Sequence, residues 1–161
     1  MISPQQLTDK FDLNIRILQM QIQGLTHADS LLQPPLRGNC LNWVLGHIAV
    51  NRDEVLSALG ETPLLSKEER GRYQVESDPV MVYSEGIIPL ERLMALLLET
   101  QERINALLPE LTLEDWVREI PSGERVVPLS QHIFSLYFHE TYHTGQTELL
   151  RQLAGTDDKV I

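Results

Sequence analysis

The apolar residues of this chain recur at steps of three and four positions in four long segments, and this spacing limits the fold more than any other feature of the sequence. Because an α-helix has about 3.6 residues per turn, residues spaced in this way form one stripe that can be buried against other helices. The segments cover residues 7–25, 40–60, 89–108 and 129–154. We therefore predict an all-α protein, a four-helix bundle in one domain that spans residues 1–161.

Residues that cap or interrupt helices mark where these segments begin and end. The side chain of Asn39 can accept a hydrogen bond from a free amide of the first turn, so we expect it to cap the second helix. Gly60 ends that helix, and Gly155 closes the last one. Pro89 is accepted in the first turn of the third helix, because its missing N–H would have no partner there.

Two stretches connect the helices in a less regular way. Residues 61–85 contain a run of charged residues and several helix breakers, which predicts one long crossover link. Between residues 111 and 128, two short extended runs, from Trp116 to Ile120 and from Glu124 to Val127, flank a turn at Ser122 and Gly123. This pattern predicts a small β-hairpin before the last helix.

The charge of the chain and its single cysteine restrict its partners and its location. Lys and Arg total 13 against 23 Asp and Glu, a formal net charge of −10, so we expect no nucleic acid as a partner. No apolar run approaches the ~20 residues of a membrane span, so we expect no membrane contact. The first residues form neither a basic segment nor an apolar run, so we expect no secretion signal, and Cys40, the single cysteine, cannot form an internal disulfide. These features favour a cytoplasmic protein.

The histidines indicate a metal site. His139 and His143 are four residues apart on the last helix, so their rings lie on one face and can converge on one ion. His47, in the middle of the second helix, is the best third ligand. We expect His27 to be exposed, and His132 lies two turns from His139, too far to share its ion. The prediction is a divalent metal, Zn²⁺ or Ni²⁺, held by three histidines with an open position.

Two other kinds of metal site match part of this pattern. Residues 139–143 match the H-E-x-x-H pattern of zinc peptidases, in which Glu140 would be the general base. However, Gln146 and Leu149 stand where one large class of these peptidases needs glycine and histidine, and no histidine follows His143. A di-iron site needs two Glu-x-x-His pairs, and this chain has one. A single metal ion therefore fits better.

Other polar or aromatic residues lie near these histidines in the helical pattern. Glu140 and Glu54 are candidate catalytic bases, although each carboxylate could equally be solvated or held in an ion pair. Gln146, one turn after His143, could orient a ligand. We also expect Trp43 and Asn51, on the helix of His47, to lie at the pocket.

Two motifs resemble those of the DinB/YfiT-like family. The first is Asn-Trp-Val-Leu-Gly-His-Ile at residues 42–48, and the second is His139-x-x-x-His143 followed by x-Gly-Gln. The resemblance implies a four-helix bundle, usually a homodimer, with a metal site formed by His47, His139 and His143. This chain differs from the family pattern at Thr144, where relatives often carry an arginine. Members of the family include transferases and isomerases that use low-molecular-weight thiols such as bacillithiol or mycothiol.

These observations lead to three hypotheses of function. The first is a thiol-dependent S-transferase-type activity on a small electrophilic substrate, with a low-molecular-weight thiol as the second substrate. The second is a metal-dependent hydrolase that uses a metal-bound water, and the third is a bundle that binds metal without catalysis. A second apolar stripe on the first helix, formed by Leu13, Ile17 and Met20, is either more core or a contact between subunits.

Overall fold

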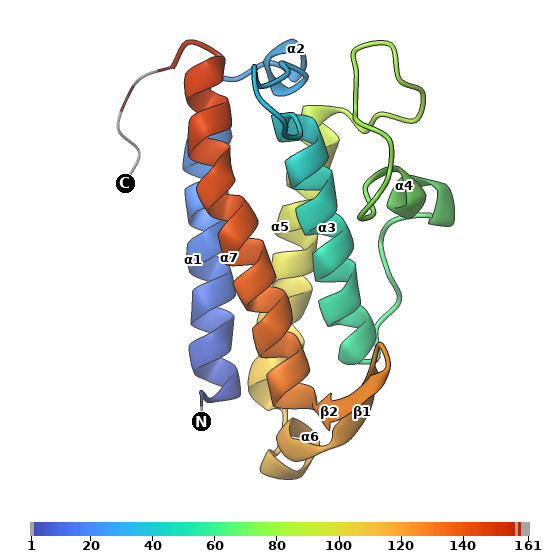
Figure 1. The fold of residues 1–161 in the computed structure, drawn as a ribbon. Coiled ribbons are helices and arrows are strands. Elements are labelled where there is room, and N and C mark those ends of the chain that lie inside the picture. Colours follow the sequence, from blue (N-terminus) through green and yellow to red (C-terminus); the bar gives the residue numbers. More distant parts are fainter. Residues whose placement is uncertain (1, 157, 159–161) are drawn as a thin grey trace.

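Four long helices lie side by side in the computed structural model, which describes residues 2–156 and 158 (Figure 1). Helix α3 packs against both α5 and α7, and α1 packs against the same two helices from the other side. The all-α bundle that the apolar spacing predicts is confirmed. The long helices are α1 (Pro4–Ile22), α3 (Leu41–Ala58), α5 (Leu90–Leu107) and α7 (Leu129–Leu153).

The shorter elements lie in the connections between these helices. A two-stranded antiparallel sheet precedes α7, with Glu119 opposite Pro128 and Ser122 opposite Arg125, so the predicted hairpin is confirmed. The short elements are α2 (His27–Ser30), α4 (Lys67–Arg72), the 3-10 turn η1 (Leu108–Glu110), α6 (Leu113–Val117), β1 (Glu119–Ser122) and β2 (Arg125–Pro128).

Two local predictions were wrong, and the predicted long link is partly helical. Cys40, not Asn39, is the N-cap of α3, and it makes no side-chain capping bond. The long link contains the helix α4, which begins with a capping box: the side chains of Ser66 and Glu69 each accept a hydrogen bond from the other's backbone amide. Trp116 lies in α6 and not in an extended run, since Thr112 starts that helix in the same reciprocal way. Both short helices follow from capping boxes in the sequence.

A layer of buried polar side chains crosses the bundle between two apolar clusters. Each long helix contributes one residue: Asn14 from α1, Arg52 from α3, Gln101 from α5 and Glu140 from α7. Arg52 donates to Glu140 at 2.8 Å and to Gln101 at 2.9 Å, and Asn14 donates to Glu140 at 3.1 Å. A buried charge is strongly destabilising unless it is paired, so this layer fixes the register of each long helix relative to the others.

Some apolar side chains of the long helices lie at the surface of the bundle. Leu13 and Met20 of the second stripe on α1 are exposed, so of the two alternatives for this stripe they are not part of the core. Leu153, in the last turn of α7, is also exposed. Within the described residues, no helix is long and apolar enough to cross a membrane.

The crossover link packs against α3 through a contact between Tyr73 and Gly46. The buried ring of Tyr73 packs where a side chain on Gly46 would lie. The hydroxyl group of Tyr73 donates to Asn42 at 3.0 Å and accepts from the amide of Ile88 at 2.8 Å. The ring can therefore not move away without loss of two buried hydrogen bonds.

Replacing Gly46 by alanine should destabilise the protein by about 1–3 kcal/mol, because the new methyl group would overlap the ring of Tyr73. Gly145→Ala is the matched control, since Gly145 is helical, exposed and has no atom within 4 Å of the added carbon. That change should stabilise by up to about 1 kcal/mol. Chemical unfolding measures both, and equal stabilities for the two variants would contradict the packing described here.

Candidate metal centre

The structure brings together the three histidines that the sequence predicts as ligands. His47 comes from the middle of α3, and His139 and His143 come from successive turns of α7. The Nε2 atom of His139 lies 3.3 Å from that of His47 and 2.9 Å from that of His143. One ligand atom from each of the three residues lies within 4.8 Å of the others, so the group could hold a metal ion.

Hydrogen bonds at Nδ1 orient two of these rings. The Nδ1 atom of His47 lies 2.8 Å from the backbone oxygen of Tyr73, and that of His143 lies 2.8 Å from the side-chain oxygen of Gln146. A carbonyl oxygen can only accept, so each Nδ1 carries the hydrogen. The lone pair of each ring is therefore on Nε2, which faces the other rings.

Asn51 orients the third ring in the same way. Its amide nitrogen donates to the backbone oxygen of Leu136 at 2.9 Å, which leaves its side-chain oxygen toward His139. That oxygen lies 3.1 Å from Nδ1 of His139 and accepts its hydrogen. All three rings thus present an Nε2 lone pair to the same point.

This donor set fits a divalent metal ion. Three lone pairs at such short distances repel one another unless a positive charge lies between them. Imidazole nitrogens about 2.0–2.1 Å from a tetrahedral Zn²⁺ lie about 3.3–3.4 Å from each other. The distances of 3.3 Å and 2.9 Å between Nε2 atoms are close to that spacing. The three histidines therefore fit the divalent metal ion that their spacing in the sequence suggests.

Burial keeps these histidines in the form that binds metals. The pKa of His143 is lowered to about 4, mainly by burial; the bond to Gln146 opposes the shift, and the nearby rings of His47 and His139 add to it. Burial is also the main cause of the lowered pKa of His47, where the bond to Tyr73 acts in the opposite direction. The pKa of His139 is lowered by burial and then by His47. Neutral rings are therefore favoured at neutral pH.

A cavity of about 430 Å³ opens beside the three rings. The ring of Trp43 forms one wall and stacks on His47, with centroids 4.7 Å apart and planes 15° apart. The Trp43 indole donates to the hydroxyl group of Ser77 at 2.9 Å, which fixes the ring. Apolar side chains form much of the remaining wall: Pro34, Val44, Val75, Leu149 and Leu150. The cavity can hold a small molecule against the Nε2 atoms.

Neither carboxylate predicted as a base faces this cavity. Glu140 is fully buried on the inner side of α7 and accepts from Arg52 and Asn14. Glu54 is half exposed and pairs with Arg70. The reason is helical geometry, since successive residues turn by about 100°, so Glu140 points into the bundle while His139 points toward the cavity. We therefore assign both carboxylates to ion pairs and do not propose them as bases.

The two remaining histidines lie outside the cluster. His132 is half buried, and its Nδ1 lies 3.0 Å from the hydroxyl group of Ser122, so it joins α7 to the hairpin. His27 is exposed, as expected, and its ring accepts from the amide of Leu90 at 3.3 Å. Thr144 is buried and donates to the backbone oxygen of Glu140 at 2.9 Å.

The sequence interpretation missed three residues of the site. The backbone of Tyr73 orients His47, and no sequence signal marks it, because every residue has a carbonyl group. Arg37 and Tyr142 both line the cavity. Tyr142 follows the helical spacing of His139 and His143 closely enough to be found, whereas Arg37 lies in a loop whose path the sequence does not predict.

Replacing Glu140 by glutamine should destabilise the protein by about 3–5 kcal/mol, because it leaves Arg52 charged and buried without its partner. Glu54→Gln is the matched control and should change the stability by less than about 1 kcal/mol, since its ion pair is at the surface. Thermal or chemical unfolding measures both changes. A Glu140→Gln variant of unchanged stability would contradict this assignment and restore Glu140 as a candidate base.

Replacing His139 by alanine should weaken the binding of Zn²⁺ more than about 100-fold. Changes to the partners of metal ligands alone weaken binding about 10–100-fold, and this change removes a donor itself. Asn51→Ala should fall in that lower range because it removes only the partner of His139. Competition with a chelating dye measures the affinities. The control His132→Ala should bind as the wild type does, and equal binding by His139→Ala would exclude the proposed ligand set.

Comparison with known proteins agrees with this architecture. Among curated proteins, none matches the chain. A conserved protein from Enterococcus faecalis has the same fold with a TM-score of 0.75 and 17% sequence identity, over 97% of this chain and 99% of that chain. A histidine-to-alanine variant of mycothiol-dependent maleylpyruvate isomerase aligns with a TM-score of 0.65 and 16% identity. That alignment covers 89% of this chain and 60% of the isomerase chain.

A family model supplies the remaining comparison. The model of the DinB superfamily matches residues 10–147, which include α3, α5 and both histidines of α7. The match also agrees with the resemblance of the two histidine motifs. This chain therefore belongs to the DinB superfamily.

Proposed function

We propose that this protein is a metal-dependent enzyme that joins a low-molecular-weight thiol to a small electrophilic substrate. The observation that carries the proposal is the convergence of three Nε2 lone pairs, from His47, His139 and His143, at the wall of a cavity of about 430 Å³. The similar fold of an enzyme described as mycothiol-dependent supports the choice of a thiol. At 16% identity that likeness concerns the fold, so the activity of this chain is a proposal.

The proposed cofactor is one divalent ion, Zn²⁺ or Ni²⁺, held by the three histidines. Structural Zn²⁺ sites use four protein ligands, and catalytic sites use three and keep a position for a substrate. When bound, such an ion would lower the pKa of a nearby thiol, so that the thiol reacts as a thiolate at neutral pH.

The residues of the chain have separate tasks in this proposal. Tyr73, Asn51 and Gln146 hold the Nδ1 hydrogens and so keep the Nε2 lone pairs directed at the cavity. Trp43 and the apolar walls exclude water from the thiol and position the electrophile. The sulfur supplies the electron pair of a new C–S bond, the leaving group departs with the electrons of its old bond to carbon, and the thiol proton goes to the leaving group or to water.

The location and assembly of the protein are part of the proposal. A reducing cytosol would keep both the thiol substrate and Cys40 reduced. The homodimer expected from the resemblance stays a prediction. Phe134 and Phe138 are exposed on α7, near enough in sequence to form one apolar strip along the helix, and a second copy could cover them.

The thiol requirement can be tested directly with Zn²⁺-loaded and Ni²⁺-loaded protein. A panel of small electrophiles is incubated with bacillithiol, mycothiol or glutathione, and adducts are measured by mass spectrometry. We expect adducts above the rate of the free thiol with the wild type and with His132→Ala, and none above that rate with His143→Ala.

Two outcomes would contradict the proposal. Turnover of an ester or amide without any thiol would favour the hydrolase. A protein that loses much stability on metal removal, and that transforms none of the substrates with or without thiol, would favour the non-catalytic metal-binding bundle.

A further inference from the structure

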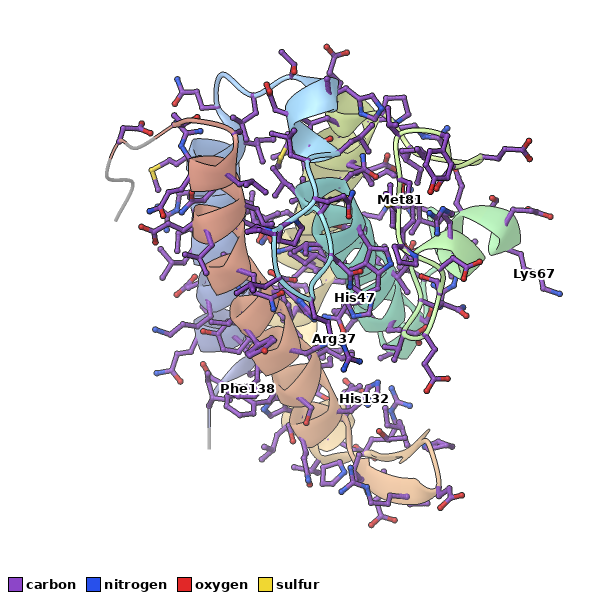
Figure 2. All side chains as sticks on the ribbon, turned by 45° about the horizontal axis from the view of Figure 1, so that its top comes forward. Arg37, His47, Lys67, Met81, His132 and Phe138 are labelled. Carbon is purple, nitrogen blue, oxygen red and sulfur yellow. The ribbon has the colours of Figure 1, made fainter. Side chains whose placement is uncertain are left out.

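Arg37 lies on the wall of the cavity that contains the three histidines. It belongs to the loop between α2 and α3, and in Figure 2 it lies beside His47. Its side chain is exposed, and it makes no hydrogen bond or ion pair with the other residues that the structure describes. Its guanidinium group is therefore available to a ligand.

The cavity differs in charge from the rest of the molecule. The chain has 23 acidic residues against 13 Lys and Arg, yet no Asp or Glu is among the described residues that line this cavity. Arg37 is the one Lys or Arg among them. A single cation without a neighbouring carboxylate, in a partly apolar hollow, produces a local positive potential that attracts anions.

The groups near Arg37 are suited to one kind of anion. A guanidinium group presents its N–H donors in a planar fork that matches the two oxygens of a carboxylate. Asn39 also lines the cavity and has an amide that can donate to a carboxylate oxygen. The Nε2 atoms of the three neutral rings carry lone pairs, so they repel an anion unless a cation lies between them and it.

We infer that the cavity takes a small ligand that carries a carboxylate, with this group bound by Arg37 and the reactive end of the ligand at the histidines. The inference rests on the proposed function, because it names the class of ligand for the same cavity. The carboxylate could belong to the electrophile or to the thiol, and both would present the same chemistry to Arg37.

Two matched pairs of probes separate these sources. The thiol pair is 3-mercaptopropionate and 3-mercaptopropanamide, and the electrophile pair is 3-chloropropionate and 3-chloropropanamide, which carry a leaving group. Each member is titrated into Zn²⁺-loaded protein and into metal-free protein, and binding is followed by ligand-observed NMR. The variants are Arg37→Gln and the control Arg125→Gln, which removes the same charge from an exposed position on β2. Circular dichroism checks that both variants are folded.

We expect the wild type and Arg125→Gln to bind the carboxylate of at least one pair about tenfold more tightly than its amide, and Arg37→Gln to lose this preference. A preference within the electrophile pair places the carboxylate on the electrophile, and a preference within the thiol pair places it on the thiol. Equal binding of acid and amide by the wild type would overturn the inference. A preference that persists in Arg37→Gln would also overturn it, since the carboxylate would then bind elsewhere.

These readouts are independent of turnover. If no thiol adduct ever forms and Arg37 still controls the preference for carboxylates, the proposed function fails and the anion site remains. If adducts form and the preference is absent or independent of Arg37, the proposed function remains and this inference fails.

Discussion

The buried ion pair between Arg52 and Glu140 is the constraint on which the arrangement of this bundle depends. Apolar contacts have no fixed direction, whereas a buried charge displaced from its partner is strongly destabilising. Arg52 lies five residues after the histidine of α3, and Glu140 directly follows the first histidine of α7. The pair therefore sets α3 and α7 at the register in which their histidines meet, and Asn14 and Gln101 connect the other two helices to it.

The site lies on the face of α7 next to the one that carries Glu140, about a quarter of a turn around the helix. Inside the bundle, α7 presents a charge that serves stability, and toward the cavity it presents neutral rings with free lone pairs. Three different elements supply the acceptors that fix these rings: the crossover link through Tyr73, α3 through Asn51 and α7 through Gln146. Such partners hold metal ligands in one orientation before the metal binds, which reduces the ordering needed on binding.

The sequence predicts the long helices and the convergence of His139 and His143 because both follow from helical periodicity, whereas the approach of His47 depends on how α3 packs against α7. The positions of His139 and His143 four residues apart need no knowledge of the tertiary structure. The role of Glu140 is different, since the H-E-x-x-H pattern is the same whether the carboxylate faces a metal or an arginine in the core. The position of Arg52 decides between these two roles of Glu140, and that position depends on how α3 and α7 pack against each other. The path of the loop that carries Arg37 depends on tertiary contacts in the same way.

X-ray absorption spectroscopy of the Zn²⁺-loaded protein tests the central claim most directly, because it counts the imidazole groups around the ion. The account predicts scattering from three imidazole rings with Zn–N distances of about 2.0–2.1 Å, together with a further ligand that is not imidazole. Scattering from one imidazole ring or none, or a first shell made of oxygen alone, would show that the three histidines do not share an ion.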